Sequence, residues 1–295
     1  MAARCRLALA VAAISIAAGA LAAPRPALAA ARAHVVVIVL ENREYDEVAA
    51  NPAAPFLNQL AARGALATNY HAVTHPSLPN YLALLGGSTF GIGDDCTECE
   101  ATGDNLALQL SRAGISWRAY MGGLPFPCFP GATSGAYAKR HNPFMYFPSI
   151  AEDPGRCARV VPQTRLDADL RRGSLAAFSW LSPDLCDDGH DCGIATADQK
   201  LASLVPRITR RLGPHGLLVV SFDEGTSDAG CCGDPGGGRV FTVLAGPDVR
   251  HGVRLRAAYD HYSLLAGLED AFGLPRLHQA RGARPLPLAI PPLGH

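Results

Sequence analysis

Two apolar runs decide the predicted fold of this 295-residue chain: HVVVIVL (His34–Leu40) and GLLVVSF (Gly216–Phe222). Both runs are continuous and rich in branched residues, and neither alternates between apolar and polar side chains. This pattern is typical of strands that are covered on both faces. We therefore expect both runs to lie in the interior of a sheet.

Weaker strand patterns alternate with amphipathic helical patterns along the rest of the chain. Further strands are expected at 116–120, 175–181 and 240–244, and helices at 55–63, 105–113, 197–212 and 261–272. Thr196 and Asp260 are plausible caps of the last two helices, and Pro206 could kink or split the first of these two. Strands that alternate with helices predict an α/β fold, a three-layer α/β/α sandwich with a mostly parallel central sheet.

Polar residues follow both of the strongest strand candidates directly. Glu41 and Asn42 come after the first run, and Asp223 and Glu224 come after the second. Parallel strands end at one edge of a sheet, where open α/β proteins bind ligands, so these side chains are expected to converge. Their oxygen atoms suit Ca²⁺, Mg²⁺ or Mn²⁺, and Zn²⁺ is also acceptable. The alternative is that they are ordinary polar loop residues, which commonly follow strands.

A candidate nucleophile lies in the stretch YHAVTHPSLPNYLALLGG (residues 70–87). Ser77 is expected to cap a helix that continues to Leu85 and ends at Gly86-Gly87. The N-terminus of a helix presents unpaired N–H groups and the positive end of the helix dipole, which together favour a phosphate oxyanion. The alternative is a serine that only caps the helix.

Several other functional classes are not supported. The sequence has no G-x-S-x-G elbow, which a hydrolase triad on an α/β sheet requires, and no Walker loop or G-x-G-x-x-G sequence. The chain has 26 Lys+Arg against 26 Asp+Glu, and 48% of its residues are hydrophobic. This composition provides no basic field for nucleic acid and argues against general disorder.

Residues 1–29 have the pattern of a secretory signal peptide. Arg4 and Arg6 precede the apolar run Leu7–Ala23, and small residues suited to cleavage follow. Residues 30–295 then hold 23 basic and 26 acidic residues, a formal charge of −3. We therefore expect a secreted protein with no stable membrane anchor; the alternative is that the apolar run spans a membrane.

Eight cysteines remain after the signal peptide, and an even number in an exported chain predicts disulfides. They lie in loops rich in Gly, Asp and Pro. Their short spacings make Cys96–Cys99 and Cys186–Cys192 plausible local bridges. The alternative is a zinc site built on Cys96-x-x-Cys99, but no second C-x-x-C is present to complete it.

Three segments, in this order, resemble the phosphoesterase family, which contains bacterial secreted acid phosphatases and phospholipases C within the alkaline-phosphatase-like superfamily. They are Glu41-Asn42-Arg43-Glu44-Tyr45-Asp46, His75-Pro76-Ser77-Leu78-Pro79-Asn80-Tyr81 and Phe222-Asp223-Glu224-Gly225. Similar order and character extend from about residue 34 to residue 274. The His-Pro-Ser-x-Pro-Asn-Tyr form and the compact length look closest to exported acid phosphatases that act on phosphoinositides.

The resemblance implies an alkaline-phosphatase-like fold, with residues 30–295 as a single phosphoesterase catalytic domain. It matches Ser77 to the nucleophile of a phosphoserine mechanism. The residues that would hold a divalent metal cation are Glu41, Asn42, Ser77, Asp223 and Glu224. A Gly-Gly-x-x-Asp-His stretch that larger relatives show after Asp-Glu is missing here, so a second metal is not carried over.

The resemblance also supplies candidates for the other catalytic roles. His190 and His261 match positions near the phosphate, and His190 is the first choice for the acid that protonates the leaving oxygen. Asn80 and Arg43 are candidates for binding the substrate phosphate. The alternatives are that His261 only flanks its helix and that Arg43 is solvated.

The expected function is therefore that of a secreted, metal-dependent phosphomonoesterase, with phosphoinositides among its expected substrates. The first alternative is a phospholipase C or other phosphodiesterase that uses the same site, and the second is an exported binding protein with a relic metal site. A sulfatase is less well supported, because no Cys-x-Pro-x-Arg stretch occurs. The aromatic stretches 124–130 and 144–147 could line a lipid-headgroup mouth, but packing within a loop is favoured.

Overall fold

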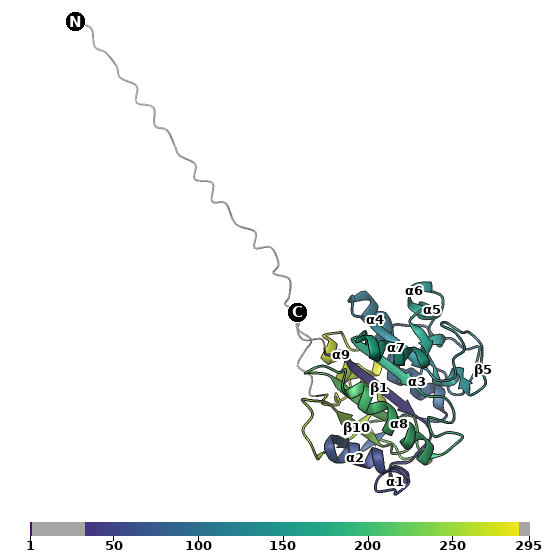
Figure 1. The fold of residues 1–295 in the computed structure, drawn as a ribbon. Coiled ribbons are helices and arrows are strands. Elements are labelled where there is room, and N and C mark those ends of the chain that lie inside the picture. The colour runs from purple at the N-terminus through teal and green to yellow at the C-terminus, as the bar shows by residue number, and fades with distance from the viewer. Residues whose placement is uncertain (2–32, 289–295) are drawn as a thin grey trace.

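The computed structural model describes Met1 and residues 33–288, and a single eight-stranded sheet forms its centre (Figure 1). In spatial order the strands are β11 (Val253–Leu255), β2 (Ala65–Ala67), β10 (Thr242–Ala245), β9 (Leu217–Phe222), β1 (Val35–Leu40), β8 (Phe178–Ser182), β4 (Trp117–Met121) and β7 (Val160–Pro162). β10 runs antiparallel to both of its neighbours, and every other pair in this sheet is parallel. The prediction of a mostly parallel central sheet is confirmed.

The two strongest strand predictions occupy the middle of the sheet as β1 and β9. Every residue of both strands is buried, as expected for strands that are covered on both faces. The two strands are parallel neighbours, and their register pairs Leu40 with Phe222. Because the strands end in register, Glu41 and Asp223 leave the sheet side by side.

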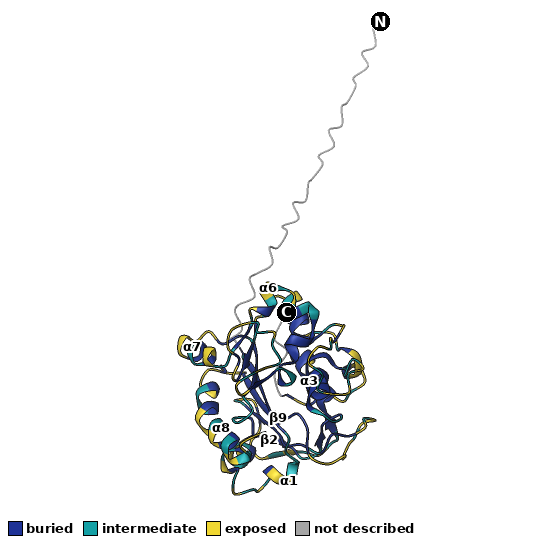
Figure 2. Ribbon diagram, turned by 90° about the vertical axis from the view of Figure 1, so that its right-hand side faces the viewer, coloured by how far each residue is buried: buried dark blue, intermediate teal, exposed yellow. Residues whose placement is uncertain are grey.

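Helices cover both faces of this sheet. They are α1 (Tyr45–Val48), α2 (Pro55–Arg63), α3 (Ser77–Gly86), α4 (Leu106–Arg112), α5 (Pro148–Ala151), α6 (Pro154–Cys157), α7 (Thr164–Arg172), α8 (Ile194–Thr209) and α9 (His261–Phe272), with 3₁₀ turns at Lys139–His141, Pro143–Tyr146 and His278–Arg281. Figure 2 shows α7 and α8 on one side of the sheet and α3 on the other. α2 packs beside α8, and α9 packs beside α3, which completes the predicted three layers.

Two small sheets lie outside the central one. β3 (Tyr70–His71) pairs with β12 (Tyr259–Asp260), and β5 (Thr133–Ser134) forms a hairpin with β6 (Tyr137–Ala138). The sequence patterns did not indicate these two-residue strands, because so short a segment has no periodicity to detect. The β3–β12 pair fixes the start of α9 beside the segment that leads to α3.

The helix termini follow the sequence expectations in part. Asp260 is the N-cap of α9, and its side chain accepts a hydrogen bond from the N–H of Ser263. Thr196 is not a cap, because α8 begins two residues earlier, after Gly193. Pro206 lies inside α8, which continues past it as one helix to Thr209.

The predicted signal peptide, residues 1–29, lies outside the described residues except for Met1. Within the described part of the chain, no helix has both the length and the apolar character that crossing a bilayer requires. Both predicted local disulfides are present, so Cys96 and Cys99 are paired with each other and not with a zinc ion. Residues 33–288 contain four disulfides, Cys96–Cys99, Cys128–Cys157, Cys186–Cys192 and Cys231–Cys232.

Glu269 is a buried carboxyl group in α9 that should make stability depend on pH. Its Oε1 accepts the N–H of Leu277 at 2.9 Å, and burial raises its pKa to about 8. A folded-state pKa above the unfolded value means that the stabilisation is complete below about pH 4.5 and is lost as pH rises through 8. The free energy of unfolding should therefore fall across this window by up to about 1.4 kcal/mol per pH unit.

Glu269→Gln tests this expectation, because the amide stays neutral and can still accept the N–H of Leu277. Urea unfolding at pH 5, 6.5 and 8, all values within the window that the raised pKa defines, should give a flatter profile for the variant than for the unmodified chain. Parallel profiles would show that Glu269 does not titrate in this range.

Candidate active site

The polar residues that follow β1 and β9 converge with Ser77 at the carboxyl edge of the sheet. Ser77 Oγ lies 3.2 Å from Glu41 Oε2 and 3.3 Å from Glu224 Oε1. The backbone N–H of Asn42 donates to Asp223 Oδ1 at 3.2 Å. The structure thus places all five residues predicted to hold a metal in one cluster.

Ser77 is the first residue of α3 and not its cap, since Pro76 occupies the N-cap position. The next free N–H of this helix, that of Leu78, donates to Asp95 Oδ1 at 2.9 Å. One of the backbone donors that was expected to face an oxyanion is therefore already bound to a carboxylate. The chemistry at Ser77 depends more on the surrounding side chains than on the helix N-terminus alone.

Asn80 is fully buried, and its amide is bound to the loop that precedes Ser77. Its Oδ1 accepts the N–H groups of Val73 and Thr74 at 3.0 and 3.2 Å. Its Nδ2 donates to the carbonyls of Thr74 and Pro76 at 2.7 and 3.1 Å. These four contacts hold the loop that carries Ser77 in a fixed conformation.

His141 and Asp188 join the cluster from loops, and sequence reasoning did not select either residue. His141 Nε2 lies 3.3 Å from Glu41 Oε2, and His141 Nδ1 lies 3.3 Å from Asp188 Oδ2. The imidazole ring stacks on Tyr81, with 5.5 Å between the ring centroids. The Tyr81 hydroxyl in turn donates to Glu41 Oε1. Asp188 lies two residues before His190 in the chain, so the match of His190 to a position near the phosphate was the signal that could have indicated it.

The charge of this cluster favours a bound cation. Burial, followed by the neighbouring Asp223 and Asp188, raises the pKa of Glu41 well above its usual value. Burial and then Glu224 raise the pKa of Asp223 well above its usual value, and burial raises the pKa of Asp188 to about 7. Buried carboxyl groups this close together are costly to ionise unless a positive charge offsets them.

Four buried polar atoms of the cluster have no hydrogen-bond partner among the residues that the structure describes. They are Asn42 Oδ1, His141 Nε2, Asp188 Oδ2 and Asp223 Oδ2. Ligand atoms of Glu41, His141 and Asp188 also lie within 4.8 Å of one another. Buried polar atoms normally have partners, so unpaired ones in a single cluster are the atoms that a metal would bind. The predominance of oxygen donors fits a hard divalent cation, and one neutral imidazole also fits Mn²⁺ or Zn²⁺.

The imidazole of His141 is suited to this role because it is neutral. Burial, followed by the positive charge of Arg140, lowers the pKa of His141 well below its usual value. A neutral ring keeps a lone pair on one nitrogen, which a protonated ring lacks.

Asn42 reaches the cluster through an unusual backbone conformation. Its φ angle is +46°, in the left-handed region that Asn adopts more readily than most other residues. A β-branched residue at this position would strain the turn that directly follows β1. The backbone conformation thus provides a reason for Asn here, apart from its amide oxygen.

The two predicted catalytic histidines occupy different environments. His190 is partly exposed, its Nδ1 contacts Asp191 Oδ1 at 2.7 Å, and its ring centroid lies 6.0 Å from that of His141. His261 is completely buried, and burial lowers its pKa to about 4. It contacts the hydroxyl of Tyr70 through Nδ1 and the carbonyl of Asp223 through Nε2. Of these two histidines, His190 is the one that combines a position next to the cluster with access to solvent.

Arg43 lies beside the cluster and binds backbone carbonyls. Its guanidinium donates to the carbonyls of Asn42 at 2.6 Å and Gly189 at 2.7 Å. It thereby joins the loop after β1 to the loop that carries Asp188 and His190.

Glu44 holds together the loops that follow β1 and β9. Its carboxylate accepts hydrogen bonds from the N–H groups of Thr226, Ser227 and Arg239. A Cβ atom on Gly225 would lie 2.2 Å from Glu44 Oε2, so only glycine leaves room for this contact. His75 adds a further link, because its Nδ1 contacts Glu224 Oε2 at 2.6 Å.

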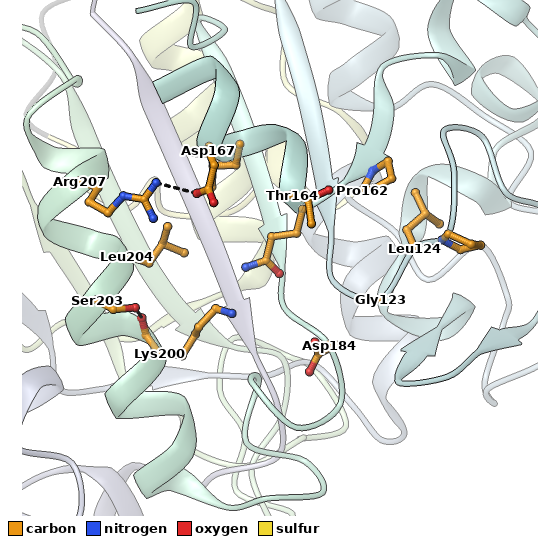
Figure 3. A pocket seen from close by; sticks show the side chains of 13 residues that line it. Gly123, Leu124, Pro162, Thr164, Asp167, Asp184, Lys200, Ser203, Leu204 and Arg207 are labelled. Atoms are coloured by element: carbon orange, nitrogen blue, oxygen red, sulfur yellow. Dashed lines mark hydrogen bonds and ion pairs between the residues drawn. The ribbon is translucent and has the colours of Figure 1, made fainter. Parts of the chain in front are cut away.

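A cavity of about 530 Å³ lies between α7, α8 and the loop after β4 (Figure 3). Its walls hold ion pairs, with Arg207 bound to Asp167 at 2.7 Å and Lys200 bound to Asp187. None of the predicted metal or catalytic residues lines it. The size of a cavity therefore does not identify the site in this chain; the convergence of buried carboxylates does.

Comparison with known proteins gives a consistent family assignment. The profile of the Phosphoesterase family matches residues 49–275, a range that begins after Glu41 and Asn42 and includes Ser77, Asp223 and Glu224. An acid phosphatase of Aspergillus fumigatus is 31% identical over 81% of this chain and 54% of its own length. A phosphatidylinositol-3-phosphatase of Mycobacterium tuberculosis is 33% identical over 85% of this chain and 80% of its own length. The chain spans 54–59% of the length of the fungal relatives that it matches.

Solved structures support the same assignment at the level of the fold. A protein in the alkaline phosphatase superfamily from Vibrio parahaemolyticus has a TM-score of 0.57 and 12% identity, covering 85% of this chain and 70% of that chain. This likeness concerns the fold alone. The family match over most of the described residues shows that the chain belongs to the phosphoesterase family.

Proposed function

We propose that this chain is a secreted, metal-dependent phosphomonoesterase that works through a phosphoserine at Ser77, with residues 30–295 as its single catalytic domain. The observation that carries the proposal is the position of Ser77 Oγ between the carboxylates of Glu41 and Glu224, in a cluster with unpaired buried ligand atoms. The names of the relatives, acid phosphatases and a phosphatidylinositol-3-phosphatase, support a phosphate monoester as substrate. A phosphoinositide is the lipid substrate that we propose for this site.

Glu41, Asn42, Asp223, Glu224 and Ser77 would hold the cation, and the positions of His141 and Asp188 allow them to contribute. A divalent cation bound there supplies positive charge that lowers the pKa of the serine hydroxyl and offsets charge on the phosphoryl oxygens. This set of oxygen donors with one imidazole accepts Ca²⁺, Mg²⁺, Mn²⁺ or Zn²⁺.

The reaction itself exchanges two P–O bonds in sequence. Ser77 Oγ gives up its proton to solvent and forms a bond to phosphorus as the bond to the alcohol breaks, and the leaving oxygen takes a proton from His190. Water then gives a proton to His190 as its oxygen attacks the phosphorus of the phosphoserine. The Oγ–P bond breaks, the serine oxygen regains a proton from solvent, and inorganic phosphate leaves. We assign the proton transfers to His190 because it lies next to His141 and is open to solvent.

The other predicted site residues act through position in this proposal. Asn80 fixes the loop before Ser77, and Arg43 fixes the loop of His190 through Gly189. His261 contacts the backbone of Asp223 and so holds that residue in place. Because Asn80, Arg43 and His261 have these positioning roles, the substrate phosphate would be bound by the cluster around Ser77.

A comparison of p-nitrophenyl phosphate with bis(p-nitrophenyl) phosphate tests the reaction class. The monoester should be turned over with a kcat/KM about 100-fold higher than that of the diester, because a second ester group removes one of the charged oxygens that the cluster would bind. Both esters release the same chromophore, so the two rates can be compared directly. A preference for the diester would instead assign the site to a phosphodiesterase or phospholipase C.

A further inference from the structure

Phe126 is the one large hydrophobic side chain among residues 33–288 that is strongly exposed, with 53% of its surface open to solvent. It lies in a segment, residues 122–138, that contains no Asp, Glu, Lys, Arg or His. Exposed prolines, Pro125 and Pro127, flank it on both sides. By contrast, the other aromatic stretch, 144–147, is buried, so the expectation of internal packing holds for that stretch and not for Phe126.

The segment that presents Phe126 is held firmly against the body of the protein. The ring of Phe126 packs edge-on against Phe129 at 5.2 Å between centroids, and Phe129 packs against Tyr137 at 5.8 Å. The Cys128–Cys157 disulfide and a 3.0 Å hydrogen bond from the Cys128 N–H to the carbonyl of Val160 tie the segment to α6 and β7. An apolar side chain that is held outward in this way loses little conformational entropy when it enters an apolar phase.

The same segment contacts the loops of the proposed active site. The hydroxyl of Tyr137 accepts a hydrogen bond from Asn142, the residue after His141, at 3.0 Å. The carbonyl of Ala136 accepts the N–H of Leu185, in the loop that continues to Asp188 and His190, at 3.0 Å. A surface that Phe126 touches would therefore lie close to the site.

The charge of this part of the chain differs from that of the rest. Residues 122–172 contain seven Lys or Arg and four Asp or Glu, a formal charge of +3. The remainder of residues 30–295 contains 16 Lys or Arg and 22 Asp or Glu, a formal charge of −6. Figure 1 shows α5, α6, α7 and β5, which all belong to residues 122–172, gathered in one part of the molecule. Part of this charge is paired, since Arg140 lies 3.6 Å from Asp95 and Arg156 lies 2.9 Å from Asp153. Among the described residues, no ion pair is formed by Arg159, Arg171 or Arg172. These unpaired arginines, together with the apolar tip, suit an anionic lipid surface.

We propose that Phe126 and the prolines beside it insert into the interface of an anionic lipid bilayer, and that this contact brings Ser77 to phosphate esters carried by lipids. The second half of this inference rests on the proposed function, whereas the lipid contact does not. Apolar burial of Phe126 and attraction by the positive residues 139–172 act together, so both a loss of Phe126 and high salt should weaken the contact.

Flotation with vesicles tests the contact directly. The unmodified chain should float with vesicles of phosphatidylcholine and phosphatidylserine and much less with phosphatidylcholine alone. Phe126→Ala should bind the anionic vesicles about tenfold more weakly, because the buried apolar area of one aromatic ring is lost. Phe56→Ala is the matched control: Phe56 is a partly exposed phenylalanine on α2, in the part of the chain with negative charge. It should leave flotation unchanged.

A fluorescence probe gives a second readout that does not depend on flotation. Trp117 and Trp180 are both buried, so a tryptophan in Phe126→Trp would be the most exposed indole in residues 33–288. Its emission should shift to shorter wavelength on addition of anionic vesicles. Equal flotation of the unmodified chain and Phe126→Ala, together with no shift for Phe126→Trp, would overturn the proposal.

Two substrates separate the lipid contact from the proposed reaction. Phe126→Ala should keep the rate on soluble p-nitrophenyl phosphate and lose about tenfold on phosphatidylinositol 3-phosphate in anionic vesicles. An unmodified chain that hydrolyses neither substrate would contradict the proposed function, and flotation would still decide the lipid contact. An equal loss on both substrates would show that Phe126 acts through the fold and would overturn a role at the lipid surface.

Discussion

Ser77→Ala is expected to reduce the turnover of p-nitrophenyl phosphate by about 10⁴-fold or more, close to the background of the assay. The substitution removes the single oxygen that would form the bond to phosphorus, and no other hydroxyl lies in its place between Glu41 and Glu224 within the described residues. Because alanine is smaller and is a good helix former at the start of α3, the fold should be retained. Circular dichroism and thermal unfolding of the variant check that point.

Ser203→Ala is the matched control, since Ser203 is an exposed serine on α8 that lies in another part of the structure. It should retain full activity. Rapid acid quenching during turnover should also give a phosphorylated peptide that contains Ser77, and the Ser77→Ala chain should give none. Full activity of Ser77→Ala, or a phosphate trapped on another residue, would remove Ser77 from the mechanism.

The part of the site that lies at strand ends could be predicted from sequence because the signal there is local. The continuous apolar runs that became β1 and β9 indicate strands buried on both faces, and the residues after such strands must lie at the sheet edge. The prediction that Glu41 and Asp223 lie close together therefore required only the assumption that the two strands are parallel. The structure confirms that assumption, with the two strands as direct neighbours.

The rest of the site depends on loops, whose positions are set by contacts between distant residues. His141 is the last residue of a 3₁₀ turn, and Asp188 lies in a loop that comes close to His141 only in the folded chain. Asn80 illustrates the same limit, because its position in the motif suggested a phosphate donor, while its amide binds the backbone of residues 73–76. Local sequence indicates the type of a side chain but not which neighbour will use its hydrogen bonds.

The strand order, likewise, could be predicted only in part from the sequence. Parallel β1, β8 and β4 follow from the alternation of strands and helices, whereas the reversed β10 does not. β10 is separated from β9 by the long loop 223–241, which returns past Glu44 and Thr74 before the strand begins. The direction of β10 is thus decided by the contacts of that loop and not by a pattern within the strand.

Removal of metal is expected to have the second largest effect. Dialysis against a chelator should lower phosphomonoesterase activity about 10³-fold, since the charge that offsets the phosphoryl oxygens and the serine alkoxide is lost. Addition of a divalent cation after the chelator is removed should restore the activity, and the most effective ion among Ca²⁺, Mg²⁺, Mn²⁺ and Zn²⁺ identifies the metal. Full activity in excess chelator would exclude a metal from the mechanism.

Removal of the metal should also change how the thermal stability depends on pH, because the metal-free cluster holds buried carboxyl groups that resist ionisation. Burial raises the pKa of Asp188 to about 7, so its contribution to stability is complete below about pH 4 and is lost as pH rises through 7. The metal-free chain should therefore have a Tm that falls between these pH values. A fixed concentration of cation should raise the Tm most at the upper end, where the ionised carboxylates bind it most tightly. At a concentration 100 times the Kd, the cation adds about 2.7 kcal/mol to the free energy of unfolding.

Asp188→Asn is the matched variant, since the amide has nearly the same shape and no charge. Without metal it should be more stable than the unmodified chain above pH 7 and should gain less from the cation. A Tm that is the same for both chains with and without metal, at every pH, would show that the carboxylates around Ser77 do not form a cation site.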